Sequence, residues 1–139
     1  MSATVPLVAR ISTLSDLAIY WATVPRKIHL LQGTLTLTDS TTLTALMAQE
    51  ATWGGYAPYS VASWGTPTDP SGIVASMISG AVFNPTGSSG TQNVWGWYMT
   101  DPPSSNLYLA EVFATPTVIN NGQPYTPSIV YQLSYLYPP

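Results

Sequence analysis

The sequence predicts an all-β domain, an antiparallel β-sandwich or jelly-roll-like fold with one short helix near the N-terminus. Three observations predict it. About six to eight runs of strand length are separated by breaks rich in Gly, Pro and Ser. Apolar residues alternate with Thr or Ser in several of these runs, which is typical of half-buried strands. Residues 93–114 hold two aromatic-rich runs around a Pro-Pro-Ser-Ser-Asn break, the pattern of a long-looped hairpin.

This hairpin is the expected centre of the fold. It carries a dense set of large apolar side chains: Trp95, Trp97, Tyr98, Tyr108 and Phe113. Glu111 stands out because Leu107, Leu109 and Phe113 share its expected face. We therefore expect a buried Glu111 that accepts hydrogen bonds from backbone N–H groups or from an arginine, Arg10 or Arg26.

The N-terminal part is expected to hold an extended arm and then the helix. Residues 1–12 form the arm, and residues 13–139 form a single β-sandwich domain. Apolar residues at helical spacing, with Ser12 or Thr13 as the N-cap, predict a helix over residues 14–22, which Pro25 stops.

The middle of the chain is expected to continue with a bulged strand and a helical turn. Residues 27–38 are expected to form a strand. Its apolar residues change from one face of the strand to the other at Gln32–Gly33, which predicts a bulge. Residues 39–51 hold a short helical turn capped by Ser40 or Thr41. Its Leu43, Leu46 and Met47 share a face.

The remaining strands are expected to be separated by well-marked turns. Residues 53–56 form a turn, and Pro58 places the strand at 56–64 on a sheet edge or at a bulge. Further strands follow at 73–83, with a kink at Gly80, and at 126–136, and loops or turns are expected at 65–72, 84–90, 115–116 and 120–122.

Composition excludes several classes of function. Only 6% of the residues are charged, where about 25% is usual. Three basic residues and a net charge of −3 leave no basic patch for phosphates, so nucleic-acid binding is excluded. The absence of cysteine removes disulfides and thiol chemistry. No apolar run is long enough for a membrane span, and the N-terminus lacks the features of a signal peptide.

No motif in the chain predicts catalysis, a cofactor site or a metal site. His29 is the sole histidine and is expected on a sheet surface, without a partner for base catalysis. Asp101 and Glu111 are the one carboxylate pair that could face each other across the hairpin, and nothing marks the pKa separation that a glycosidase needs. The sequence thus predicts a non-enzymatic protein.

The aromatic residues leave an alternative open. Trp53, Tyr56, Tyr59 and Trp64 cluster near Gly-rich turns and could form a sugar-stacking platform of a carbohydrate- or receptor-binding β module. Such a module would belong to a fibre or to a secreted lectin-like protein. The competing interpretation is that these rings fill a β core and subunit contacts.

The order of segments resembles a family of small structural proteins of tailed bacteriophages. The resemblance rests on the N-terminal helix and on three runs of sequence: TTLTALMAQEATWGGYAPYSV from Thr41, NVWGWYMTD from Asn93 and LYLAEVFATPTVINNGQ from Leu107. It covers roughly residues 10–135. The chain differs by Pro102-Pro103 in the hairpin loop and by Val112 where the family commonly has a basic residue.

The resemblance implies a virion structural protein without an active site. We expect a capsid decoration or cement protein that binds major capsid subunits, or other virion proteins, as a symmetric homo-oligomer such as a trimer. A capsid-surface location is favoured over the tail. The low charge fits this expectation, since interface cores are depleted in charge. The expected interface lies in the arm and at the hairpin tip, at Val5, Pro6, Leu7, Val8, Pro102 and Pro103.

Overall fold

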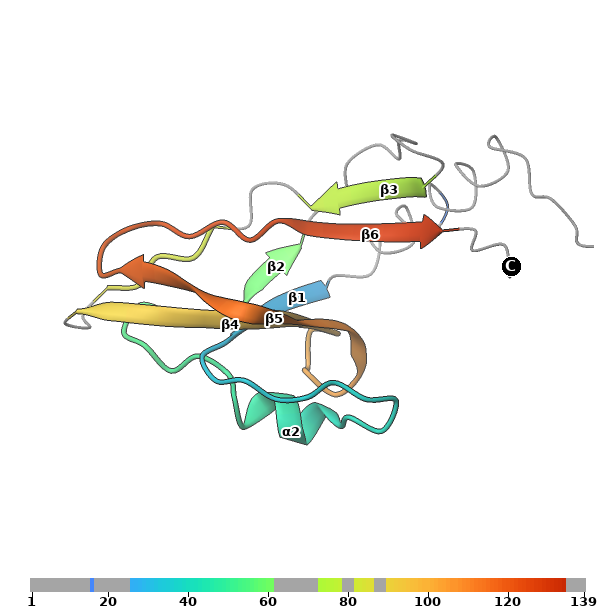
Figure 1. Ribbon diagram of the computed structural model, residues 1–139, viewed down its shortest axis with the longest axis horizontal. Coiled ribbons are helices and arrows are strands. Elements are labelled where there is room, and N and C mark those ends of the chain that lie inside the picture. Colours follow the sequence, from blue (N-terminus) through green and yellow to red (C-terminus); the bar gives the residue numbers. More distant parts are fainter. Residues whose placement is uncertain (1–15, 17–25, 62–72, 79–81, 87–89, 135–139) are drawn as a thin grey trace, which may run out of the picture. The chain divides into compact units, whose positions relative to one another are not determined.

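The computed structural model describes residue 16 and residues 26–61, 73–78, 82–86 and 90–134 (Figure 1). Contacts divide the chain into two compact units. One comprises Pro25–Val61 and Ala81–Pro127, and the other comprises Met1–Val24, Ala62–Gly80 and Ser128–Pro139. The prediction of one domain over residues 13–139 stays a prediction, and each unit is described by itself.

The described residues are mostly β-structure. The larger unit holds β1 (Arg26–Leu31), α2 (Leu43–Met47), β2 (Tyr59–Val61), β4 (Thr91–Thr100) and β5 (Leu107–Asn120). Its four strands form one antiparallel sheet in the order β2-β1-β4-β5. The other unit holds β3 (Ile73–Ile78) and β6 (Ile129–Ser134), which pair antiparallel. The β-rich class is confirmed, whereas the sandwich or jelly-roll arrangement stays a prediction.

The predicted central hairpin is confirmed as β4 and β5. These two strands pair antiparallel, with Trp97 opposite Glu111 and Tyr98 opposite Ala110. The pairing is interrupted between Val94 and Gly96, where the β5 partner jumps from Thr117 to Val112. This irregularity absorbs the residues around Pro116, which has no N–H for a sheet hydrogen bond. Pro116 was expected in a turn and instead lies inside β5.

The predicted strand over residues 27–38 is half correct. β1 ends at Leu31, and Gln32–Gly33 is a bend that ends the strand, so the expected bulge is wrong. Residues 49–51 lie beside the end of β1. The N–H of Gln32 donates to the Gln49 carbonyl (2.8 Å), and the N–H of Ala51 donates to the Leu30 carbonyl (2.9 Å). The Thr-rich stretch that follows is a loop.

The predicted helical turn is confirmed as α2, with a different cap. Thr42 is the N-cap, and its hydroxyl accepts from the N–H of Ala45 (3.2 Å). Leu46 is fully buried against Leu31 and Tyr98. Met47 is 47% exposed, so it does not share the buried face of Leu46. A helix of five residues has room for few inward positions, and Leu46 is its buried residue.

The turns and the edge strand follow the sequence signals. The turn at residues 53–56 is confirmed, with Gly55 at φ +77° and the N–H of Tyr56 donating to the Trp53 carbonyl (3.1 Å). β2 is an edge strand as Pro58 predicted. The turn at Asn121–Gly122 is also present. The arm at 1–12, the helix at 14–22 apart from the helical Asp16, and the loop at 65–72 lie outside the described residues.

The close approach of β4 and β5 at Gly96 predicts a specific sensitivity. A Cβ on Gly96 would overlap the backbone carbonyl oxygen of Glu111, which cannot move without disturbing the hairpin. We expect Gly96→Ala to lower the free energy of unfolding by about 2 kcal/mol or more, measured by denaturant unfolding. Gly33→Ala is the control, because its Cβ would meet the flexible end of the Gln49 side chain. A Gly96→Ala variant as stable as Gly33→Ala would contradict this packing.

Candidate functional site

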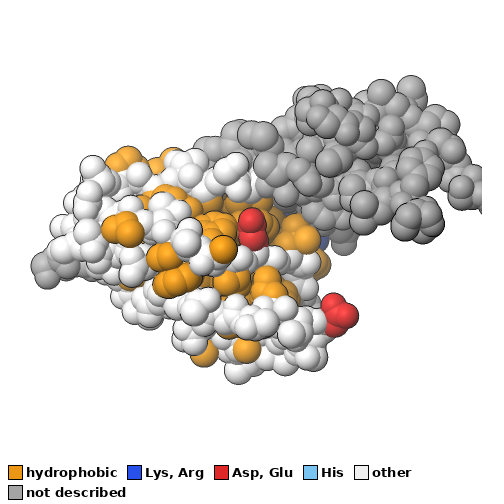
Figure 2. Space-filling view, viewed as in Figure 1, with side chains coloured by type: hydrophobic (Ala, Val, Ile, Leu, Met, Phe, Trp, Pro, Cys, Tyr) orange, Lys and Arg blue, Asp and Glu red, His pale blue; other side chains and the backbone are white. Residues whose placement is uncertain are grey.

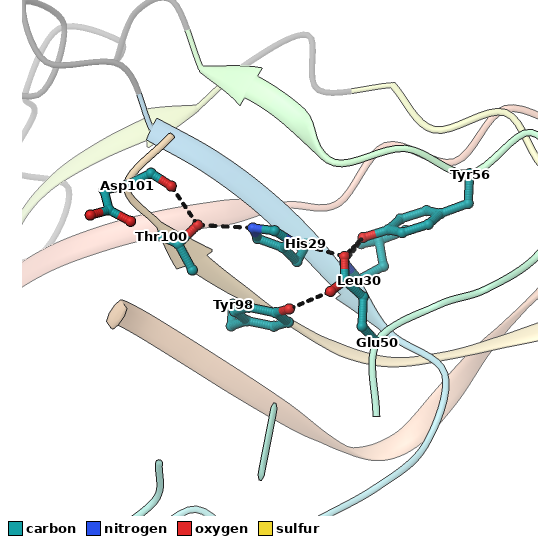
Figure 3. A network of polar contacts seen from close by, with 7 residues as sticks. All are labelled: His29, Leu30, Glu50, Tyr56, Tyr98, Thr100 and Asp101. Carbon is teal, nitrogen blue, oxygen red and sulfur yellow. Dashed lines mark hydrogen bonds and ion pairs between the residues drawn. The ribbon is translucent and has the colours of Figure 1, made fainter. Parts of the chain in front are cut away.

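A buried histidine lies at the centre of the polar contacts in the larger unit (Figure 3). His29 on β1 is 3% exposed, so its expected place on the sheet surface is wrong. Its ring Nδ1 lies 2.8 Å from Oε1 of Glu50, and its Nε2 lies 2.9 Å from the hydroxyl of Thr100. The histidine is buried because β1 is an inner strand, between β2 and β4, and the segment with Glu50 packs beside it.

Glu50 collects hydrogen bonds from three separate parts of the chain. Besides His29 on β1, the hydroxyl of Tyr98 on β4 donates to Oε2 (2.6 Å), and the hydroxyl of Tyr56 donates to Oε1 (2.9 Å). Tyr56 in turn accepts from the backbone N–H of Leu30 (3.1 Å). Both carboxylate oxygens thus have donors, which is how a protein offsets the cost of burying a charge.

The surroundings set the charge of this carboxylate. Burial by itself raises the pKa of Glu50, but the hydrogen bonds from His29 and Tyr98, the charge of His29 and the hydrogen bond from Tyr56 outweigh it, so the pKa lies below its usual range. Burial and the neighbouring carboxylate raise the pKa of Tyr56 and of Tyr98 above their usual value, so both hydroxyls remain donors.

The imidazole also has a specific packing partner. The rings of His29 and Tyr98 are stacked, with centroids 4.4 Å apart and planes 8° apart. Tyr98 therefore holds the histidine in two ways, by its ring face directly and by its hydroxyl through Glu50. Within the described residues, no group of three or more His, Cys, Asp or Glu side chains could hold a metal ion. The arrangement is suited to fixing segments on the sheet.

Asp101 organises the tip of the hairpin. Its Oδ1 accepts from the N–H groups of Ser105 (2.6 Å) and Asn106 (3.0 Å), and its Oδ2 accepts from the side-chain amide of Asn106 (2.6 Å). Burial alone would raise the pKa of Asp101, but these hydrogen bonds and the charge of Arg26 lower it below the usual value. Asp101 therefore shapes the loop between β4 and β5.

The expected pairing of Asp101 with Glu111 has no support in these contacts. Asp101 is bonded to its own loop, whereas Oε2 of Glu111 accepts from the indole N–H of Trp97 (2.9 Å). Glu111 is exposed, so its expected burial is wrong. The arginine expected beside it, Arg26, is instead buried with its guanidinium 3.9 Å from the ring centroid of Tyr108. Arg10 lies outside the described residues.

The aromatic residues of the sugar-binding alternative pack on one another. Trp53 is 8% exposed, and its ring lies 5.7 Å from that of Tyr56. Tyr56 and Tyr59 both contact Phe83, at centroid distances of 6.0 and 6.3 Å. Trp64 lies outside the described residues. These contacts favour a packing role for the three described rings.

The expected interface residues are split between described and undescribed parts. Pro102 is half-buried and Pro103 is exposed, both in the turn that Asp101 organises. Val5, Pro6, Leu7 and Val8 lie outside the described residues. The His29–Glu50–Tyr98 network was missed from the sequence, and the acid among aromatics and glycines at residues 50–56 was the signal that could have suggested it.

Comparisons with known proteins leave the chain without an assigned family. No protein-family model, no curated protein and no solved structure matches it. Among the described residues, none of the helices has the length and apolar character that a membrane crossing requires.

The network predicts that removing the Tyr98 hydroxyl lowers the stability of the protein by a large amount. Tyr98→Phe keeps the ring stacked on His29 but removes the hydroxyl that donates to Glu50. We expect the free energy of unfolding to fall by roughly 1.5–3 kcal/mol, since the lost hydrogen bond is to a charged group. Tyr108→Phe, at a position 39% exposed, is the control and should change it by less than about 0.5 kcal/mol. Equal effects would argue against the network.

The lowered pKa of Asp101 predicts that this residue contributes to the loss of stability at acid pH. Because its pKa is lowered in the folded chain, its stabilisation is present above the ordinary value of 3.8 and is lost as the pH falls below it. In Asp101→Asn, we expect lower stability at neutral pH and a shallower loss of stability below about pH 4, followed by denaturant unfolding across pH. Asp39→Asn, at an exposed position before α2, is the control. An unchanged pH profile in Asp101→Asn would refute this role.

Proposed function

We propose that the protein is a non-enzymatic structural protein of a virion, a capsid decoration or cement protein that binds the major capsid protein as a symmetric oligomer such as a trimer. The observation that carries the proposal is the surface of the larger unit, which combines few charges with exposed apolar side chains (Figure 2). The resemblance of three long segments to small phage structural proteins supports the same assignment.

The edge of the sheet is the best candidate for such contacts. β5 ends the four-stranded sheet and runs for 14 residues, of which Ile119 alone is buried. Val118 is 60% exposed and Tyr108 is 39% exposed. Glu111 is the single charged residue in this strand. An edge with a single charge loses less hydration free energy than a charge-rich one when a neighbouring subunit covers it.

The internal use of the polar groups supports a structural role over catalysis. Glu50 and His29 bond to each other and to residues of the sheet, and Asp101 bonds to its own loop. Groups arranged in this way stabilise a rigid scaffold, and a decoration protein needs a rigid scaffold to bridge subunits. The N-terminal arm with Val5–Val8 and the tip at Pro102–Pro103 are proposed as further contacts on the capsid surface.

Occupancy on particles tests both the role and the surface. In particles purified from cells that produce the wild-type protein during infection, quantitative mass spectrometry should find copies in the hundreds, in a fixed ratio to the major capsid protein. Val118→Asp should lower this occupancy about tenfold or more, because it places a charge in the contact. Thr36→Asp, at an exposed position in the loop after β1, is the control.

The alternative outcomes are distinct. A handful of copies would move the protein to the tail or portal. Its absence from particles would refute the virion role. Full occupancy of Val118→Asp with hundreds of copies would keep the role and refute the contact on β5.

A further inference from the structure

The hydrogen bonds around His29 determine how many protons its ring holds. The Thr100 hydroxyl has one hydrogen, and it lies 2.8 Å from the carbonyl oxygen of Asp101, which can only accept. Thr100 must therefore accept from Nε2 of His29 at 2.9 Å. This assigns one ring proton to Nε2.

The other ring nitrogen faces an acceptor as well. Nδ1 lies 2.8 Å from Oε1 of Glu50. That carboxylate already accepts hydrogen bonds from the hydroxyls of Tyr98 and Tyr56. The Tyr56 oxygen accepts from the N–H of Leu30, so its own hydroxyl proton is donated to Glu50. An ionised Glu50 has no proton to give, so Nδ1 must also donate. With Glu50 ionised, every contact is satisfied only when the ring carries two protons.

We propose that His29 and Glu50 form a proton-dependent latch that holds the segment after α2 on the sheet. The doubly protonated ring and the ionised carboxylate attract each other across a half-buried contact between β1 and this segment. If His29 loses its Nδ1 proton, the hydrogen bond from Nδ1 to Oε1 of Glu50 is lost. If it loses its Nε2 proton, the Thr100 hydroxyl must donate to Nε2, and its hydrogen bond to the Asp101 carbonyl is lost. If Glu50 gains a proton, the charge pair is lost.

Among the groups that contact this pair, His29 and Glu50 are the ones whose protonation controls the latch. The segment after α2 contributes Glu50 and Tyr56, and β4 contributes Tyr98 and the uncharged Thr100. Burial raises the pKa of both tyrosines, so they stay neutral as the pH rises through neutrality. Further charges among the described residues are Asp101, which follows Thr100, Arg26, which begins β1 and acts on Asp101, and Lys27, which pairs with Thr100. The lowered pKa of Asp101 keeps it ionised near neutral pH.

The protonation states of both groups limit the latch. The contact needs a ring that holds two protons and a carboxylate that holds none, and it weakens when either condition fails. The pKa of Glu50 is lowered, so its stabilisation is present above its ordinary value of 4.5 and is lost as the pH falls through the lowered pKa. The segment after α2 should be held most firmly at pH values where Glu50 is ionised and the His29 ring holds two protons.

Two backbone amides report on the latch directly. The N–H groups of Gln32 and Ala51 bond across the contact between β1 and the segment of Glu50. Their hydrogen-exchange protection factors, corrected for the intrinsic rate, should pass through a maximum with pH in the full-length protein. On the alkaline side they should fall roughly tenfold to a hundredfold. Amides between β4 and β5 should stay nearly constant, because that hairpin does not depend on the latch.

The ring itself can be followed because the chain has one histidine. The ¹⁵N and ¹H signals of His29 should show two ring protons where Gln32 and Ala51 are best protected, and one where protection is lost. Glu50→Gln should remove the pH dependence of both amides, whereas Glu111→Gln, at an exposed acid on the same sheet, should preserve it. If Glu50→Gln does not fold, the wild-type comparison of ring protons with amide protection still decides.

Either of two results would overturn the proposal. One is a ring with a single proton at every pH at which the chain is folded. The other is protection of Gln32 and Ala51 that does not follow the proton count of His29.

Discussion

The larger unit depends on the partial burial of one carboxylate. A glutamate that is half-buried needs donors at both oxygens, and Glu50 finds them on β1, on β4 and in the turn that follows it. These donors converge only when the segment after α2 lies along β1. The cost of leaving the charge without partners thus makes the position of this segment specific.

This constraint fixes how one face of the sheet is covered. With Glu50 held beside β1, the preceding residues must cross from the bend at Gln32–Gly33 to Gln49 and return, and α2 forms within that span. Leu46 then reaches Leu31 and Tyr98, and half-buried Leu35 and Leu43 pack around them. Tyr98 belongs to both the polar network and the apolar cluster. A change at this residue therefore disturbs hydrogen bonding and packing together.

Local signals predicted those parts of the fold that local residues decide. The β4–β5 hairpin, the turn at Gly54–Gly55 and the edge position of β2 each depend on turn chemistry or on a proline, which a single stretch of sequence reveals. The pairing of residues 49–51 with the end of β1 was missed because these residues come from elsewhere in the chain. The burial of His29 and the exposure of Glu111 were missed for the same reason. Alternation along one strand does not show which face a distant segment will cover.

Charged residues are few in this chain, and several of the described ones are used inside the larger unit. In a chain with 6% charged residues, Glu50 and Asp101 take part in internal hydrogen bonds, and Arg26 is buried over Tyr108. These three charges act inside the unit, and contacts at the β5 edge, where Glu111 is the single charge, would depend mainly on apolar area and backbone groups. Such contacts are weakly sensitive to salt, because screening acts on exposed charges. Pro116 and the irregularity opposite Gly96 divide the edge into two short stretches, which limits uncontrolled strand pairing and favours a partner shaped to fit.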